Sequence, residues 1–186
     1  MDRRIKKSGF TIIELVVVIF IIGLLATISI PNFRKRRPSY ERKQFVSHIN
    51  ALVQTAWQEA IEKFKLRVVA FNEKTRQVSI GEMPIDPKNP TKKDFKPLKF
   101  KYLKTNYTWP ENLVIKNFFV NGKDELVRSD KREIYIFINP EGFTDDAIIN
   151  ILDTSDLTID GKEKQLSLVL NPFKIQFKKY DSFQKP

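Results

Sequence analysis

The chain has 186 residues, enough for one globular domain with appendages and too few for a multidomain enzyme. Its 33 lysine and arginine residues outnumber 22 acidic residues, and the net charge of +11 favours acidic partners such as phospholipid head groups or nucleic acid. The absence of cysteine excludes disulfides and thiolate metal sites. A single histidine, His48, argues against histidine-based metal chemistry and a conventional catalytic triad.

The N-terminal segment joins a basic leader to a long apolar run. Four basic residues precede Gly9, and the run from Phe10 to Ile30 contains one charged residue, Glu14. A helix over residues 10–30 would be about 31 Å long, which matches the roughly 30 Å hydrocarbon core of a bilayer. We therefore predict a transmembrane helix at 10–30. A secretory signal peptide and an ordinary, unprocessed signal anchor are the alternatives, although no A-x-A-like cleavage site follows the run.

Glu14 distinguishes this segment from a plain anchor. A carboxylate within an apolar run costs on the order of 2 to 3 kcal/mol, so it requires a compensating partner. If the chain were cut after Gly9, the new α-amino group of Phe10 on a neighbouring subunit would be a suitable partner, because pairing relieves two buried charges together. The alternative is that Glu14 extends to the membrane interface from the start of the helix.

Residues 6–15, with the sequence KKSGFTIIEL, resemble the class III leader and methylation motif of type IV prepilins and pseudopilins. The resemblance implies that a prepilin peptidase cleaves the Gly9–Phe10 bond and N-methylates Phe10, and that Glu14 is the assembly carboxylate. It extends through the apolar helix to Pro31, where the family resemblance and the missing backbone donor of proline both predict a kink or local melting.

The same resemblance implies a single-pass protein of the cell inner membrane, with a cytoplasmic leader and a periplasmic C-terminal domain. The expected partners are the prepilin peptidase, inner-membrane lipid, and other pilins or pseudopilins in a periplasmic pseudopilus or surface pilus. The orientation rests on the resemblance, because four basic residues at 34–37 equal those of the leader and leave the positive-inside count undecided.

The rest of the chain predicts an α+β fold, in which a long N-terminal helix packs on an antiparallel β-sheet domain as a pilin-like lollipop. Apolar residues at spacings of three and four form one helical stripe: Phe45, Ile49, Leu52, Val53, Ala56, Ala60, Ile61 and Phe64. The predicted divisions are a leader at 1–9, the transmembrane helix at 10–30, an amphipathic continuation at 31–66 and a β-rich periplasmic domain at 67–186.

Short apolar or alternating runs between turn residues predict the strands of that domain. They lie near 66–71, 77–80, 98–103, 113–120, 133–138, 147–152, 165–170 and 173–178. Residues 134–143 contain an apolar strand followed by a Pro-x-Gly turn, and a second apolar strand comes after them. This pattern resembles the H-type minor pseudopilins of type II secretion systems. The lack of cysteine fits this type, since the disulfide loop common in major pilins cannot form.

Outside the anchor, a segment at 88–109 interleaves lysines with aromatic residues. Lys99, Lys101 and Lys104 are candidate anion- or DNA-binding residues, as a DNA-uptake minor pilin would require. The alternative, which we favour, is that alternating lysines protect an edge strand from unwanted pairing.

Five aspartates between residues 145 and 160 form the main acidic concentration, and calcium would be their natural ligand. The EF-hand spacing is absent, so turn capping and solubility are the favoured explanation. With no P-loop, dinucleotide-binding glycine pattern or paired catalytic carboxylates, the sequence predicts a structural subunit rather than an enzyme, with no metal or cofactor.

Overall fold

The computed structural model describes residues 11–83, 95–100, 104–128 and 132–186, without the side chains of residues 26–37. The chain divides into two compact units, Met1–Ser39 and Tyr40–Pro186. Helix α1 (Ile12–Lys63) contributes to both units and is helical through Pro31 and Pro38. The side chain of Pro31 lies outside the described part, so the kink there stays a prediction.

In the second unit, six members of the predicted apolar stripe are buried: Phe45, Ile49, Leu52, Val53, Ala56 and Ala60. Ile61 and Phe64 are instead exposed, contrary to the prediction. Ile61 lies within the helix, near its end, and is 43% exposed. Phe64 is exposed because α1 ends at Lys63: Phe64 has a left-handed backbone (φ 49°), and the Lys65 N–H donates to the Ala60 carbonyl at 3.1 Å. This is a Schellman-type helix end, in which the chain turns away from the helical stripe.

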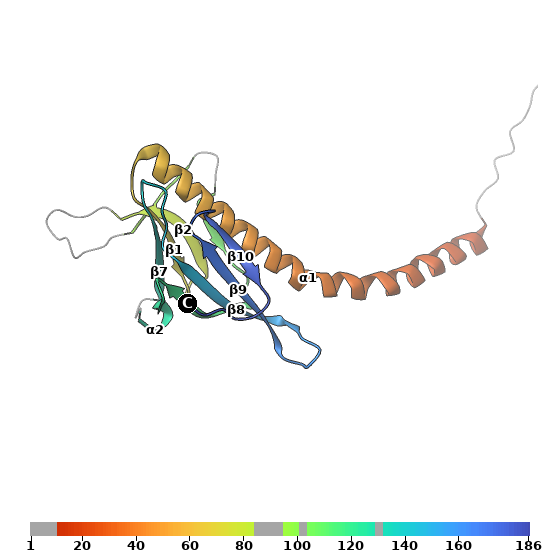
Figure 1. The fold of residues 1–186 in the computed structure, drawn as a ribbon. Helices are drawn as coiled ribbons and strands as arrows, with labels where there is room; N and C mark the ends of the chain where they lie inside the picture. Colours follow the sequence, from red (N-terminus) through yellow and green to blue (C-terminus); the bar gives the residue numbers. More distant parts are fainter. Residues whose placement is uncertain (1–10, 84–94, 101–103, 129–131) are drawn as a thin grey trace, which may run out of the picture. The chain divides into compact units, whose positions relative to one another are not determined.

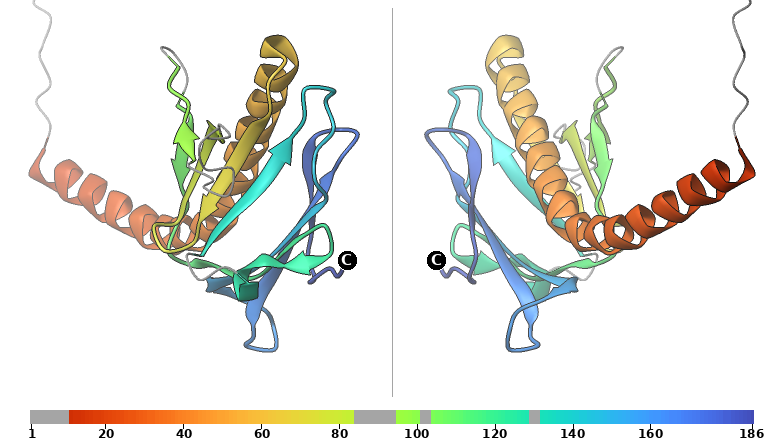
Figure 2. Two further views of the ribbon diagram at one scale, coloured as in Figure 1. Left: turned by 90° about the vertical axis from the view of Figure 1, so that its left-hand side faces the viewer. Right: turned by 90° about the vertical axis from the view of Figure 1, so that its right-hand side faces the viewer.

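The strands form two antiparallel sheets, and Figures 1 and 2 show the second half of α1 beside them. The first sheet has the order β3-β2-β1-β7, with β4 also paired to β2. Its strands are β1 (Arg67–Asn72), β2 (Gln77–Glu82), β3 (Lys96–Pro97), β4 (Asn106–Thr108) and β7 (Glu133–Ile138). The second sheet has the order β10-β9-β8-β5-β6. Its strands are β5 (Leu113–Val120), β6 (Lys123–Asp124), β8 (Ala147–Leu157), β9 (Glu163–Asn171) and β10 (Gln176–Tyr180), and the short helix α2 (Glu125–Arg128) follows β6.

Six predicted strands are confirmed as β1, β2, β5, β7, β8 and β9, and the predicted α+β class is confirmed with them. The single sheet expected from the sequence is instead two sheets, because β7 pairs with β1 whereas β8 pairs with β5 and β9. Alternate residues of β7 are buried, which is the pattern of a strand with one face on the core.

The prediction of a strand at 98–103 is wrong for residues 98–100, which form no strand. Residues 101–103 lie outside the described part. Two short strands, β3 and β4, share the edge of β2 in its place. The backbone of Ile80 explains this: its carbonyl accepts from the Leu98 N–H and its N–H donates to the Thr105 carbonyl, each at 2.9 Å. Lys99 and Phe100 therefore lie beyond the end of β3 and do not protect an edge as strand residues.

The last predicted strand, 173–178, begins later than expected. The side-chain oxygen of Asn171 accepts hydrogen bonds from the N–H groups of Phe173 and Lys174, both at 2.9 Å. Ile175 then has a left-handed backbone (φ 50°) and donates to the Asn171 carbonyl at 2.8 Å. This side-chain-capped turn occupies the first residues of the predicted strand, so β10 begins at Gln176.

Polar side chains of α1 bond to backbone groups of both sheets. The Asn50 side chain accepts from the Phe177 N–H at 2.7 Å and donates to the Phe177 carbonyl at 3.3 Å, which fastens the helix to β10. Closer to the end of the helix, Trp57 Nε1 donates to the Gly142 carbonyl at 3.1 Å, which fastens α1 to the turn after β7.

A buried ion pair lies where α1 enters the second unit. Arg42 Nη1 donates to Asp153, whose side chain is fully buried, and also contacts Asp156 at 2.8 Å. Asn112 and Ser155 donate further hydrogen bonds to Asp153, at 3.0 and 2.7 Å. Burial acts to raise the pKa of Asp153, but the hydrogen bonds from Ser155, Asn112 and Arg42 together hold this pKa below its usual range.

We predict that Asp153→Asn lowers the free energy of unfolding by about 3 kcal/mol at neutral pH, because it leaves the Arg42 charge without its buried partner. Since the folded-state pKa of Asp153 is lowered, its stabilisation is present above the unfolded pKa of about 3.9 and is lost as pH falls through the folded pKa. Denaturant unfolding of the detergent-solubilised protein should therefore show a difference between variant and wild type that shrinks below about pH 4.

The matched control for that measurement is Asp181→Asn, which removes a surface ion pair to Lys179 (2.8 Å) and should cost less than about 1 kcal/mol. A deficit of Asp153→Asn that stays constant down to pH 3 would show that the ionised carboxylate is not what stabilises the fold.

We also predict that Asn50→Ala costs about 1 to 3 kcal/mol, because the Phe177 backbone groups lose their partners while the Phe177 residue remains buried. Gln54→Ala on the exposed side of the same helix is the control, with an expected effect within about 0.5 kcal/mol. Denaturant unfolding followed by tryptophan fluorescence measures both, and equal effects of the two substitutions would contradict the role assigned to Asn50.

Candidate functional site

The described part of the first unit is an α-helix with apolar side chains on all sides. Glu14 and Gly23 are the exceptions among residues 12–25. The large apolar side chains here are 47% to 87% exposed, so nothing in the unit covers them. A helix that is apolar all round requires an apolar environment such as lipid or neighbouring helices.

Within the residues that the structure describes, no helix offers a stretch both long and apolar enough to cross a membrane. The predicted transmembrane helix at 10–30 includes Phe10 and the side chains of residues 26–30, which lie outside that description. The predicted division of the chain into leader, membrane helix, amphipathic helix and β-rich domain stays a prediction.

Glu14 closes a capping box at the start of α1. The Glu14 N–H donates to Thr11 Oγ1 at 3.3 Å, and Glu14 Oε2 accepts from the Thr11 N–H at 3.0 Å and from Thr11 Oγ1 at 3.1 Å. Each residue thus satisfies a backbone donor of the other, and the carboxylate also lies favourably at the positive end of the helix dipole.

Glu14 was predicted from the sequence to act in assembly, and its capping role was not predicted. The signal was present, because Thr11-x-x-Glu14 before an apolar run is the ordinary sequence pattern of a capping box. The structure brings Thr11 and Glu14 together, whereas Gly9 and Phe10 lie outside the described residues. The predicted roles of Gly9, Phe10 and Glu14 in cleavage, methylation and assembly stay predictions.

Among the described residues near the candidate DNA-binding lysines, two aromatic rings pack against other parts of the protein. Lys99 and Lys104 are exposed, and Lys101 lies outside the described part. The Trp109 side chain is only 3% exposed, and the Tyr107 ring stacks on the His48 ring with centroids 4.3 Å apart. Because these rings pack within the protein, they are not available to stack on bases.

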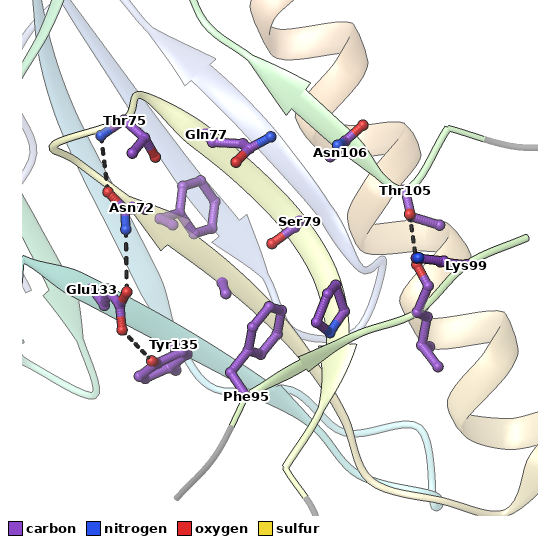
Figure 3. Close-up of a pocket in the computed structure, with 14 residues that line it drawn as sticks. Asn72, Thr75, Gln77, Ser79, Phe95, Lys99, Thr105, Asn106, Glu133 and Tyr135 are labelled. Carbon is purple, nitrogen blue, oxygen red and sulfur yellow. Dashed lines mark hydrogen bonds between the residues drawn. The ribbon is translucent and has the colours of Figure 1, made fainter.

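A hollow of about 390 Å³ lies over the first sheet, between side chains of β1, β2 and β7 and the segment 95–99 (Figure 3). The Phe95 ring forms one end of it. A Cβ atom on Gly81 would lie 2.2 Å from Phe95 Cε2, so a side chain at position 81 would displace this ring from β2.

Two polar side chains in this hollow donate to the carboxylate of Glu133, which also lines it. Tyr135 Oη donates to Glu133 at 2.7 Å and Asn72 Nδ2 donates to the same carboxylate at 3.2 Å, as Figure 3 shows. Burial and the hydrogen bond to Glu133 raise the pKa of Tyr135, so its phenol stays protonated and remains a donor. The group therefore stabilises the sheet surface and shows no arrangement for catalysis.

Asp145 bonds to the turn residue Asn121, in line with the favoured explanation, whereas the buried ion pair of Asp153 was not predicted. Asp145 accepts from the Phe137 N–H at 2.8 Å and from Asn121 Nδ2 at 2.9 Å, and Asp153 is the buried partner of Arg42. Among the described residues, no group of three or more histidine or acidic side chains is placed to hold a metal ion.

Comparisons with known proteins find similarity both in sequence and in fold. Residues 4–30 match the family described as the prokaryotic N-terminal methylation motif. The chain is 38% identical over 64 residues to type II secretion system core protein G of Klebsiella michiganensis. The aligned residues cover 34% of this chain and 42% of the relative. It is 39% identical over 75 residues to a fimbrial protein of Pseudomonas aeruginosa, with 40% and 48% covered. The chain thus spans less than half the length of these curated relatives.

The fold is similar to that of the minor pseudopilin EpsH from the type 2 secretion system of Vibrio cholerae. Two solved structures of EpsH superpose with TM-scores of 0.52 and 0.53 at 13% and 14% identity, covering 76% and 78% of this chain and 97% of EpsH. The N-terminal segment thus matches the methylation motif, and the fold is similar to that of a minor pseudopilin.

Proposed function

We propose that the chain is a structural subunit of a type II secretion pseudopilus or type IV pilus-like filament, made as a precursor anchored in the inner membrane. The proposal is carried by the start of α1. Among residues 12–25, which lie within the matched methylation motif, the apolar side chains are exposed and Glu14 is the one charged residue. The fold likeness to EpsH supports a minor pseudopilin of the H type within this class.

Processing at the Gly9–Phe10 bond would place a new positive charge beside the capping box. The α-amino group of Phe10 would then adjoin Thr11, at the positive end of the helix dipole, where a cation is unfavourable. Methylation of this amine leaves its charge in place. A carboxylate nearby offsets the charge, and Glu14 is the acidic residue at this end.

Glu14 has the capacity to cap its own helix and to bind a neighbour's amine at the same time. Its hydrogen bonds from Thr11 end on Oε2, and among the described residues Oε1 accepts none. Because an ionised carboxylate offers about four lone-pair sites, a second donor can bind without breaking the cap. Pairing with the Phe10 amine of a neighbour would then neutralise both charges as apolar helices pack together in the filament.

Processing can be tested by intact-mass spectrometry of protein extracted from membranes of cells with an active prepilin peptidase. We expect a chain that begins at Phe10 and carries one added methyl group. Gly9→Val is the control and should keep its leader, since a Cβ at this position obstructs an extended chain in a tight protease site. A wild-type chain that retains residues 1–9 in those cells would reject the proposed function in favour of an unprocessed signal-anchored domain.

Assembly can be tested with three substitutions that separate the cap from the charge. Glu14→Gln keeps a capping side chain and removes the charge, Thr11→Ala removes the cap and keeps the charge, and Glu14→Ala removes both. If charge pairing drives assembly, the two Glu14 variants are cleaved normally but enter filaments poorly, whereas Thr11→Ala still assembles. The measurement is the filament-bound fraction after shearing and sedimentation.

The opposite pattern would identify helix capping as the role of Glu14. In that case Glu14→Gln would assemble like wild type, and Thr11→Ala and Glu14→Ala would share a defect. Normal incorporation of all three variants would contradict any role of this residue in assembly.

A further inference from the structure

A groove of about 640 Å³ lies between α1 and the strand β4, within the second unit. Its helical wall is formed by residues of α1 at spacings of three and four: His48, Ala51, Leu52 and Thr55. The opposite wall is formed by Lys104, Asn106, Tyr107 and Thr108. Figure 3 shows β4, which carries Asn106, between β2 and α1. One side of β4 therefore pairs with β2, and the other side faces the groove.

The backbone of β4 presents unpaired groups on the side of the groove. In an antiparallel pair, alternate residues direct their N–H and C=O groups toward the partner strand. Thr105 and Trp109 do so, each through one hydrogen bond of 2.9 Å to the segment 76–80. Asn106 and Thr108 alternate with them and therefore direct their backbone groups away from β2. Among the described residues, none bonds to these backbone groups of Asn106 and Thr108.

Two other edge strands of the protein are closed at the equivalent kind of position. Phe177 in β10 has its N–H and carbonyl bonded to the side chain of Asn50. Phe137 in β7 has its N–H bonded to the Asp145 carboxylate at 2.8 Å and its carbonyl bonded to the Asp145 N–H at 3.2 Å. Groups that cap an edge in this way prevent another strand from adding there. Along β4 no described residue provides such a cap, so this edge is open to a further strand.

The groove has the length of a short extended peptide. The helical wall from His48 to Thr55 rises about 10 Å, and the strand wall from Lys104 to Thr108 extends about 13 Å. At about 3.3 Å per residue, roughly four extended residues fill this length. A peptide that adds to a sheet edge gains affinity from backbone hydrogen bonds and selectivity from the side chains beside it.

The side chains of the groove favour an acidic partner. Lys104 is exposed and contributes an ammonium group, and the exposed His48 ring adds an N–H donor. No acidic side chain is among the described residues that line the groove. Glu41 lies two turns before His48 on α1, outside this lining. Burial and, to a smaller extent, the charge of Glu41 raise the pKa of Tyr107, so the Tyr107 phenol stays a neutral donor.

We propose that this groove binds an extended acidic segment of another protein, which adds to β4 as a further strand. The backbone of the segment pairs with Asn106 and Thr108, and its carboxylates lie near Lys104 and His48. The contact lies wholly within the second unit, so it is independent of processing at Gly9 and of any membrane anchoring by the first unit.

The location of the contact can be tested with a library of random peptides of about ten residues, selected by mRNA display on the full chain in detergent micelles. We expect the recovered peptides to be rich in aspartate and glutamate. Ala51→Trp fills the groove from an exposed position and should weaken their binding at least about tenfold in fluorescence polarisation. Gln54→Trp is the matched control, exposed on the same helix outside the groove, and should change binding less than about twofold.

N-methylation of the recovered peptides tests strand addition with the protein unchanged. In an added strand, one alternate set of N–H groups points toward β4 and the other set points away. Methylating the first set should abolish binding, and methylating the second should leave most of it. Loss of binding with both sets would indicate a helical partner, and loss with neither would indicate side-chain contact alone. Either result would overturn strand addition.

Charge reversal tests the preference for acidic segments. Lys104→Glu should weaken the binding of the recovered peptides about fivefold or more. Lys99→Glu changes the net charge equally at an exposed lysine outside the groove, so its effect should be smaller. Equal losses would assign the binding to the whole basic surface and contradict the groove. A selection that yields no binding peptide, or peptides that are insensitive to Ala51→Trp, would also overturn the proposal.

Discussion

The second unit depends on the burial of one face of α1 against two β-sheets. Apolar side chains of both sheets are buried together with those of α1 in one core. Phe45, Ile49 and Val53 have no exposed surface, and fully burying side chains of this size is worth about 1.5 to 3 kcal/mol each. The helix is therefore the shared interior wall of the unit, and removing it would expose both sheets.

Burial alone does not determine how the helix lies on the sheets, because the hydrophobic effect has no direction. Directional bonds supply that information at successive positions along α1: Arg42 to Asp153, Asn50 to Phe177 and Trp57 to Gly142. Together they hold the helix against β8, β10 and the turn after β7. All three bonds start from the part of α1 that belongs to the second unit.

The elements that were predictable from the sequence are those with strong periodic patterns. The buried stripe of α1 and the alternating strands β5 and β7 follow from local side-chain spacing, and the methylation motif is visible as a short contiguous signal. The errors arose where a non-local or backbone feature overrode that spacing. Residues 98–100 alternate like a strand, but the edge of β2 is shared between β3 and β4, and Phe64 continues the helical stripe but adopts a left-handed backbone. The network around Asp153 joins positions more than 100 residues apart, so no window of sequence contains it.

The two hydrogen bonds between Asn50 and Phe177 also affect how copies of this chain meet. β10 is an edge strand, and an unpaired edge invites another strand to add to it. At Phe177 both backbone groups are already bonded to a side-chain amide, which imitates the pairing of a further strand. This position is closed to cross-β growth. A second copy that met the edge of β10 would find no free backbone donor or acceptor at Phe177.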